Sequence, residues 1–391
     1  MFRKFLITTI ALSLALMAPV ASAASPDTVQ TAKDDVADVP QRPGIIQRVI
    51  NYFNESNKSR PTGRMDFSFI GGPHYSSDSK FGIGVVASGI YTTNPEDTTL
   101  APSNLSIKAD ATTAAHFTLT VSGEHISPKD VYRLSYEIDY SYIDTKYWGI
   151  GFDQCKNDAN ESKYKYLASN AKVVFARNMG SHFYFGPIMT FNYVHARDFQ
   201  HPELWAGLPR RMFSYGIGAS VRYDTRDNTT APSQGIVIRM DQTFDARWMG
   251  NRHGYSVNEM TLAGYRQIWR GGILAAQLHS RITWGDTPWG MLSYIGGSHN
   301  MRGYFEGRYR DKSEIDFCAE LRQHVWRRNS AVIWLGVASV FPRFTDIHFN
   351  TLLPNAGIGY RWEFKKNVNV RVDLGFGRRQ TGIIFSINEA F

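Results

Sequence analysis

Four consecutive residues, Met301-Arg302-Gly303-Tyr304, place a guanidinium, a glycine and a phenolic ring in one short stretch. A guanidinium that leaves bulk water needs a carboxylate, and its planar fork suits a bidentate one. The glycine permits a tight backbone passage, and the tyrosine supplies a ring that packs against a wall. These residue types favour fixing a segment in place over transforming a substrate.

Motifs of known catalytic chemistry are absent from the sequence. It contains no G-x-S-x-G, H-E-x-x-H, P-loop or G-x-G-x-x-G pattern. The eleven histidines are scattered, and we interpret one such as His201 or His253 as a solvated loop residue. Two cysteines, Cys155 and Cys318, exclude a four-cysteine metal site, and sequence alone does not place them close enough for a disulfide. We therefore expect no enzyme, no cofactor, no bound metal and no nucleic-acid partner.

Composition limits the fold class. The 391 residues are 43% hydrophobic and 14% aromatic with a formal net charge of +8, which is too apolar for a disordered chain. Beyond the first 25 residues no run of about 18 apolar residues occurs, which excludes a helical membrane protein. A membrane β-barrel stays possible because its signal is alternation along each strand.

The first 23 residues read as an export signal. Arg3 and Lys4 precede an apolar stretch over residues 5–17, and Ala21-Ser22-Ala23 supplies the small residues of a cleavage site. We predict a signal peptide over residues 1–23. The alternative, an uncleaved anchor, fits less well because the apolar run is too short to span a bilayer.

Residues 24–64 form a short segment before the main domain. An acidic linker is followed by apolar residues at positions 45, 46, 49, 50 and 53, which predict an amphipathic helix over residues 44–57. That helix either packs under or into the mouth of the main domain, or lies at a membrane interface or against a partner. The 41 residues are too few for a globular domain, so we expect a periplasmic linker.

Residues 65–391 repeat one pattern of alternating residues and turns. In 211–224, for example, Phe213, Tyr215 and Ile217 share one face while Ser214 and Gly216 share the other. We predict sixteen strands, at 65–73, 80–92, 101–112, 115–124, 130–143, 164–178, 182–196, 211–225, 235–247, 254–268, 271–284, 314–326, 329–341, 352–363, 367–377 and 380–391.

A soluble sandwich also alternates, but the length and the even number of these strands favour an all-β transmembrane antiparallel barrel. The last segment supports this interpretation, because Phe385, Ile387 and the terminal Phe391 share one apolar face. This ending is similar to the signal that outer-membrane assembly machinery recognises. We therefore expect a barrel in the outer membrane of a Gram-negative bacterium, with the long connection at 285–313 on the surface side.

Several stretches together resemble a known family. Arg302-Gly303-Tyr304 precedes the strand that contains Asp316 and Glu320, and three further stretches match at 223–228, 357–361 and 371–373. The combination resembles the BamA- and TamA-like outer-membrane assembly barrels, the bacterial surface antigen family. In that family the sixth surface loop carries an [IV]-R-G-[FY] motif and folds into the lumen.

The resemblance implies luminal partners for Arg302. Strand parity directs Glu320 and Asp373 inward, so Glu320 is our first choice and Asp373 our second. The alternative is an exposed loop with a solvated arginine. Two departures weaken the expected contact: residues 336–341 lack the acid that this strand usually carries, and Met301 replaces the usual branched aliphatic. We also expect no polypeptide-transport-associated (POTRA) domain in residues 24–64, which puts a client-assembly role in question.

The leading functional hypothesis is a BamA/TamA-type barrel that assists insertion or translocation of proteins, or of lipids, in the outer membrane. A passive diffusion channel and an outer-membrane enzyme are the alternatives. Gly71-Gly72-Pro73 is expected to end the first strand and weaken its pairing with the last, although it could simply form the first turn. Expected partners are outer-membrane lipid and lipopolysaccharide, protein clients and the assembly machinery. Basic residues lie at Arg308, Arg310 and Lys312 in the long loop and in the pairs at 327–328 and 365–366 in turns. They either contact anionic headgroups or lipopolysaccharide, or are ordinary solvated residues of loops and turns.

Overall fold

The computed structural model describes residues 66–94, 96–97, 100–365 and 368–391. The predicted signal peptide (1–23), and the linker with its short helix (24–64), lie outside these residues. No helix in the described ranges is long and apolar enough to cross a membrane.

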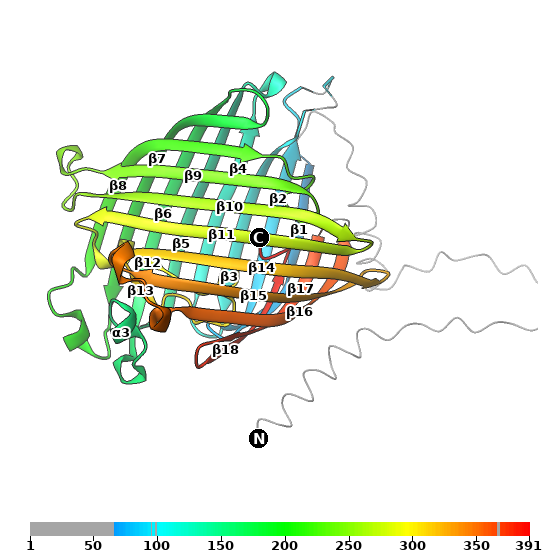
Figure 1. Cartoon of the computed structure of the whole chain (residues 1–391). Coiled ribbons are helices and arrows are strands. Elements are labelled where there is room, and N and C mark those ends of the chain that lie inside the picture. Colours follow the sequence, from blue (N-terminus) through cyan, green and yellow to red (C-terminus); the bar gives the residue numbers. More distant parts are fainter. Residues whose placement is uncertain (1–65, 95, 98–99, 366–367) are drawn as a thin grey trace, which may run out of the picture. The chain divides into compact units, whose positions relative to one another are not determined.

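Sixteen strands close into one barrel in the described part of the chain (Figure 1). Each strand pairs antiparallel with its neighbour, from β1 to β11 and then from β14 to β18, and β18 pairs back with β1. Strands β12 and β13 form a separate two-stranded sheet inside the β11–β14 connection. The predicted sixteen-stranded antiparallel barrel is confirmed.

The strands of the barrel and of the small sheet have the following bounds: β1 (Asp66–Ser76), β2 (Lys80–Tyr91), β3 (Ser103–Thr112), β4 (Phe117–Ile126), β5 (Tyr132–Tyr147), β6 (Ser162–Asn178), β7 (Phe183–Arg197), β8 (Arg211–Asp224), β9 (Gly235–Asp245), β10 (Tyr255–Trp269), β11 (Gly272–Gly285), β12 (Ser293–Tyr294), β13 (Arg310–Asp311), β14 (Ser313–Trp326), β15 (Asn329–Phe341), β16 (Leu353–Lys365), β17 (Val368–Gly377) and β18 (Gln380–Ile387). The short helices lie in connections: η1 (Pro128–Asp130), α3 (Phe152–Cys155), η2 (Asp158–Asn160), η3 (Pro202–Trp205), η4 (Arg247–Met249), η5 (Trp289–Met291), η6 (Phe344–Asp346) and η7 (Phe349–Thr351).

The barrel wall is apolar outside and polar inside. In β8, Phe213 and Ile217 are 48% and 45% exposed, whereas Ser214 and Ser220 are buried. A soluble sandwich would bury the apolar set, while a membrane barrel presents it to lipid and turns the polar set inward. The outward position of the apolar face therefore distinguishes the membrane barrel from the soluble sandwich, which the sequence pattern alone does not.

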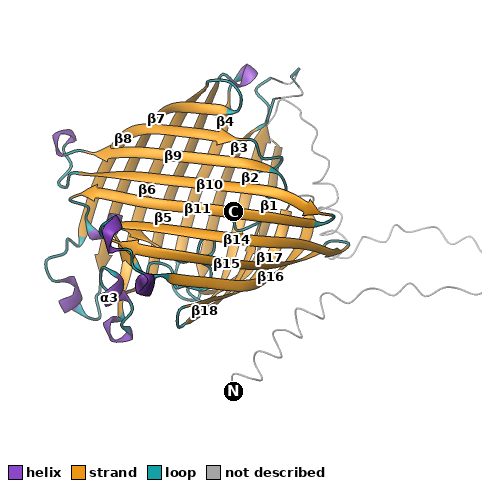
Figure 2. Ribbon diagram, viewed as in Figure 1, coloured by secondary structure: helices purple, strands orange, loops and turns teal. Residues whose placement is uncertain are grey.

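The long connections and most of the short helices gather at one end of the barrel, which strand parity makes the surface side (Figure 2). An aromatic cluster fills this end, with the Trp205 ring 4.1 Å from Tyr147 and 4.6 Å from Trp289. Arg310 lies 5.3 Å from the Tyr147 ring. The predicted headgroup contacts of Arg308 and Arg310 are wrong, because both side chains are buried in these loop contacts.

The seam between β1 and β18 is held by few contacts. Ser76 and Ile384 are the single ladder pair recorded between them in the described ranges. Around it, the Ser77 amide donates to the Ile383 carbonyl at 3.2 Å, and the Ile383 amide donates to the Ser77 hydroxyl at 3.0 Å. The neighbouring β17–β18 ladder, by contrast, extends from Val370 to Gly377.

Several predicted strand ends differ from the structure by two to four residues, and two of them lie next to the seam. β1 does not stop at Pro73 but continues to Ser76, because Pro73 pairs only on its β2 side and needs no donor toward β18. β18 ends at Ile387, so the terminal Phe391 does not continue the outward apolar face. Instead the chain turns at Asn388, whose φ is +68°, and the Phe391 ring lies 6.4 Å from that of luminal Tyr265.

Candidate functional site

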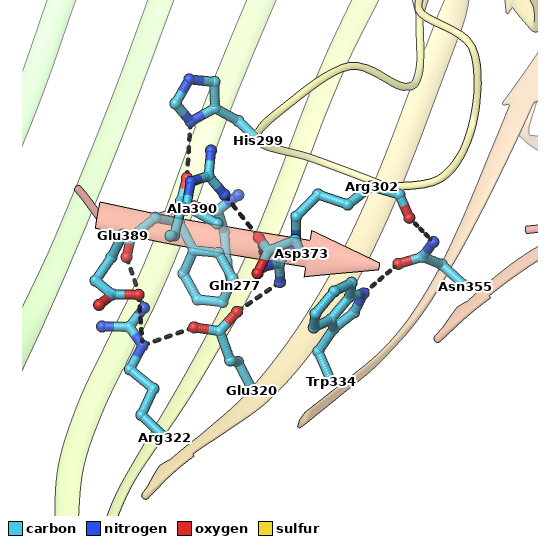
Figure 3. A network of polar contacts seen from close by, with 12 residues as sticks. Gln277, His299, Arg302, Glu320, Arg322, Trp334, Asn355, Asp373, Glu389 and Ala390 are labelled. Atoms are coloured by element: carbon cyan, nitrogen blue, oxygen red, sulfur yellow. Dashed lines mark hydrogen bonds and ion pairs between the residues drawn. The ribbon is translucent and has the colours of Figure 1, made fainter. Parts of the chain in front are cut away.

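The connection between β11 and β14, residues 286–312, begins at the surface-side end and brings its Met301–Tyr304 stretch into the barrel interior, and we call it the luminal loop. Met301, Arg302 and Tyr304 are each exposed by 2% or less. Figure 3 shows Arg302 near Glu320 and Asp373, which come from the barrel wall.

Arg302 contacts both carboxylates that the sequence named. Its Nη2 lies 2.5 Å from Glu320 Oε2, and its Nη1 lies 2.9 Å from Asp373 Oδ2. The guanidinium also lies 3.8 Å from the centre of the Trp334 ring. Burial alone would lower the pKa of the Arg302 guanidinium, but the charges of Glu320 and Asp373 outweigh it and hold that pKa above its usual value.

Three further arginines extend this contact along the wall. Arg322 Nε donates to Glu320 at 2.6 Å, while Arg361 and Arg371 donate to Asp373 at 2.5 and 3.1 Å. All three guanidinium side chains are almost fully buried. The carboxylates compensate these buried positive charges, although Arg361 Nη2 and Arg371 Nε have no hydrogen-bond partner within the described residues.

Glu389 completes the set, and sequence reasoning missed its role. It accepts from Arg361 Nε at 2.8 Å and from Asn369 Nδ2 at 2.6 Å. Its neighbour Ala390 accepts a hydrogen bond from His299 of the luminal loop, so the tail after β18 contacts the loop directly (Figure 3). The signal was present, because an acid interrupts the final apolar stretch while several inward arginines lack an assigned partner. We call Arg302, Glu320, Arg322, Arg361, Arg371, Asp373 and Glu389 the charge network.

Glycines let the loop backbone approach the wall. Gly303 has a φ of +110°, which side-chain-bearing residues rarely adopt. On β17, a Cβ built on Gly375 would lie 2.2 Å from the Arg302 carbonyl oxygen, and one on Gly377 would lie 2.6 Å from the Tyr304 ring. The loop therefore fits only against a wall that lacks side chains at these positions.

Tyr304, the last residue of the motif, is held by two hydrogen bonds. Its hydroxyl donates to the Pro354 carbonyl at 2.6 Å and accepts from the Arg378 amide at 2.8 Å. Burial raises the pKa of this hydroxyl to about 12, so the proton that makes the bond to Pro354 is retained at neutral pH.

Met301 faces the segment of β15, residues 336–341, in which the acid expected from the family resemblance is missing. It belongs to a buried cluster with Ala338 and Val340 on β15, and a Cβ on Gly336 would lie 3.6 Å from its sulfur. The two sequence departures thus compensate each other, since a flexible thioether packs well against a wall segment without charge.

Both cysteines are free and buried. Cys155 lies in α3, and burial raises the pKa of its thiol to about 11. Cys318 lies in β14, with its side chain inside the wall.

The charge network can hold the luminal loop at one position but offers no evident reacting group. Removing one partner of a buried ion pair costs about 3–5 kcal/mol, because the other charge stays buried without compensation. Displacing the loop would separate Arg302 from two such partners at once. The arrangement therefore holds the loop firmly against the wall.

Comparison with known proteins places the fold. No curated protein sequence matches the chain. Among solved structures, the chain is similar to BamA from Haemophilus ducreyi lacking POTRA domains 1–3, at 12% identity and a TM-score of 0.56, over 83% of this chain and 70% of that one. It is also similar to CdiB from Escherichia coli, at 10% identity and a TM-score of 0.56, over 84% of this chain and 64% of that one. The similarity to CdiB from Acinetobacter baumannii has 11% identity and a TM-score of 0.52, over 82% of this chain and 59% of that one. The chain spans less than two thirds of either CdiB, and identities this low indicate a shared fold only.

A family model adds the sequence relationship. The model of the Omp85 superfamily domain matches residues 102–374, which include most of the barrel, the luminal loop and Asp373. The chain therefore belongs to the Omp85 superfamily, whose barrels lie in the outer membrane of Gram-negative bacteria.

Proposed function

We propose that this chain is a BamA/TamA-type barrel that assists the insertion or translocation of polypeptide segments at the outer membrane. In this proposal the β1–β18 seam opens sideways, and the luminal loop controls that opening through the charge network. The protein is not an enzyme, and its function is mechanical.

The observation that carries the proposal is the combination of a weakly paired seam with a strongly held loop. Among the described residues the seam has one ladder pair, at Ser76 and Ile384, whereas Arg302 is 1% exposed between two carboxylates. Edge strands with free donors and acceptors pair readily with another extended chain. A segment entering the seam would therefore extend the sheet by the same hydrogen bonds that join β17 to β18.

The loop and the tail also connect the network to the seam. Arg302 contacts Asp373 on β17, and Glu389 follows β18 by two residues. A shift of the loop would change the support of both strands next to the opening. These contacts support control of the seam by the loop.

A passive diffusion channel is the second candidate, and the position of the loop disfavours it. The loop and the aromatic cluster at Tyr147 fill the interior toward the surface side. A porin-like function would require a lumen without this loop and a steady open conductance. Lipid transfer through the same seam remains within the proposal, as do contacts with outer-membrane lipid and lipopolysaccharide along the exposed wall.

A disulfide across the seam tests the proposal. Ser76→Cys with Ile384→Cys, in a Cys155→Ala and Cys318→Ala background, would join β1 to β18 at their ladder pair. We would reconstitute the protein in lipid vesicles and measure how fast a urea-unfolded eight-stranded barrel folds, by heat-modifiable gel migration. We expect acceleration by the unstapled protein, loss of acceleration on oxidation and recovery on reduction.

The matched control joins two strands that do not border the seam. Ser106→Cys with Ser122→Cys connects opposed residues of β3 and β4, where the ladder is continuous. Its oxidation should leave the acceleration intact. If the seam disulfide leaves it equally intact, lateral opening is not part of the function.

A further inference from the structure

A second buried polar cluster lies on the luminal face, apart from the charge network. It comprises His279 on β11 and Glu314 and Asp316 on β14, and one donor atom of each lies within 4.8 Å of the others. His279 is opposite Asp316 in the β11–β14 ladder, and Glu314 shares the face of Asp316 two residues earlier. The strand register therefore brings one imidazole and two carboxylates to a single point.

The two carboxylates are buried and short of partners. Glu314 and Asp316 are 1% and 2% exposed. Within the described residues, neither Glu314 oxygen has a hydrogen-bond partner, and neither does Asp316 Oδ1. Carboxylate oxygens left this way are costly, because burial removes the water that would otherwise serve them.

A proton on His279 does not satisfy this geometry. The Nδ1 atom lies 2.9 Å from Glu314 Oε1 and 3.1 Å from Asp316 Oδ2, but a single N–H can point at only one of them. The hydrogen bond goes to Asp316, which leaves Glu314 with an electrostatic contact alone. A cation at this point would serve all three groups together.

The excess of carboxylates around His279 favours a divalent cation over a single proton. His279 Nε2 lies 3.8 Å from Glu259, whose carboxylate also lies 3.6 Å from Lys172, and Lys172 pairs with Asp241 at 2.5 Å. Arg281 lies opposite Glu259 in one ladder and opposite Glu314 in the other, so this set has four carboxylates against one lysine, one arginine and one histidine. With the imidazole neutral, as a metal ligand must be, two negative charges remain in excess.

The contacts around the cluster match those that orient metal ligands. A ligating histidine usually has a carboxylate near its other ring nitrogen, and Glu259 lies 3.8 Å from His279 Nε2, a distance that makes this an electrostatic contact. The Asp316 carboxylate accepts a hydrogen bond from Asn300 of the luminal loop at 3.2 Å, and Asn300 accepts one from Gln277 at 3.0 Å. Hydrogen bonds from outside the cluster thus orient Asp316.

We propose that His279, Glu314 and Asp316 bind one divalent transition-metal ion, with zinc as the best-fitting probe, on the luminal wall beside the loop. Imidazole nitrogen with two carboxylate oxygens suits this class of ion, and three protein ligands leave a fourth tetrahedral position for water. Ligand bonds of about 2.0–2.2 Å would set nitrogen–oxygen separations of roughly 3.4 Å. The two present separations need to widen by only a few tenths of an ångström.

The ion would join three parts of the structure. It would bridge β11 to β14 and, through Asp316 and Asn300, support the luminal loop near Met301. The site is distinct from the residues that contact Arg302, so it goes beyond the proposed seam function and does not depend on it.

Zinc binding by the full-length, tag-free protein in detergent micelles tests the proposal. After removal of metal with a chelator, we would titrate Zn²⁺ against a chromophoric competitor and measure stoichiometry by elemental analysis. One ion per barrel is expected. Glu259→Gln changes a residue outside the ligand set and should weaken zinc binding by ~10–100-fold. His279→Ala and Asp316→Asn each remove a ligand and should weaken it more.

Two controls keep the result decisive. His201→Ala changes a loop histidine whose side chain is 42% exposed and should leave affinity unchanged. Heat-modifiable migration would verify that each variant is a folded barrel, and visible absorption of Co²⁺ by the wild type gives a second readout that needs no variant. Absence of binding at about 1 mM Zn²⁺, or equal affinity in the wild type and the Asp316→Asn protein, would overturn the site.

Discussion

Replacing Arg302 with alanine removes the one loop side chain that reaches both Glu320 and Asp373. Both carboxylates have 0% exposure, so each loses a charged partner where water does not replace it. Loss of one partner in a buried ion pair costs about 3–5 kcal/mol, and the lost contact with the Trp334 ring adds to it.

The remaining arginines reduce this cost. Glu320 keeps Arg322 at 2.6 Å, and Asp373 keeps Arg361 and Arg371. Neither carboxylate is therefore left alone, and we expect a destabilisation at the lower end, about 3 kcal/mol. The larger effect should be on the loop, because the wall arginines hold the carboxylates but do not hold the loop.

Two measurements separate these effects. Denaturant unfolding of the vesicle-bound protein, followed by tryptophan fluorescence, gives the free energy of unfolding. Conductance across a planar bilayer reports whether the loop has left the lumen, and we expect a rise for Arg302→Ala. Arg343→Ala is the matched control, because its side chain is 79% exposed and its pair with Asp346 should be worth at most ~0.5 kcal/mol. If both variants unfold alike and neither changes conductance, the charge network does not hold the loop.

Three further predictions concern the backbone fit, a buried thiol and the tail. Gly375→Ala should lower the free energy of unfolding by about 1–3 kcal/mol, because its Cβ would meet the loop backbone at 2.2 Å. Gly72→Ala, which has open space around it, should change the free energy of unfolding by at most ~0.5 kcal/mol, and denaturant midpoints compare the two variants. Burial raises the pKa of the Cys155 thiol to about 11 from its usual 9, which leaves ~100-fold less thiolate at pH 8. In a Cys318→Ala background, Cys155 should therefore be alkylated about 100-fold more slowly in the folded protein than after unfolding. The alkylation rate of the folded protein should rise tenfold per pH unit up to about pH 11. Glu389→Gln should cost about 1.5–3 kcal/mol and speed amide exchange after β18, and unchanged exchange would contradict the tail contacts.

The strands were predictable because a period of two records which face of the wall each residue occupies. Phe213 and Ser214 already differ in the sequence as they differ in exposure, and sixteen such segments leave few alternatives to a barrel. The same parity directed Glu320 and Asp373 inward, and an arginine in the lumen needs a buried acid. Local pattern and charge complementarity were therefore sufficient for the centre of the site.

Features that depend on the path of loops and ends were not predictable in this way. Arg308 and Arg310 looked like solvated loop cations, but the loop folds back and buries them against aromatic rings and carbonyls. Phe391 continued the apolar parity of β18, but the left-handed turn at Asn388 takes it off the wall. Periodicity describes a strand only while the strand lasts, and tertiary contacts decide where it ends.

The choice of arginine throughout the charge network follows from donor number. Each guanidinium has five N–H donors, so a single arginine can reach a carboxylate and also a backbone carbonyl of a separate segment, although Arg361 Nη2 and Arg371 Nε have no partner within the described residues. Arg371 donates to the Ser298 carbonyl of the luminal loop at 2.6 Å, and Arg322 donates to the Phe391 carbonyl of the tail at 2.9 Å. Lysine would keep the charge but lacks the planar fork that satisfies a carboxylate and a distant carbonyl together. Because buried ion pairs are often no more stable than apolar packing, the network is better explained by the one position it imposes on loop, tail and wall than by added stability.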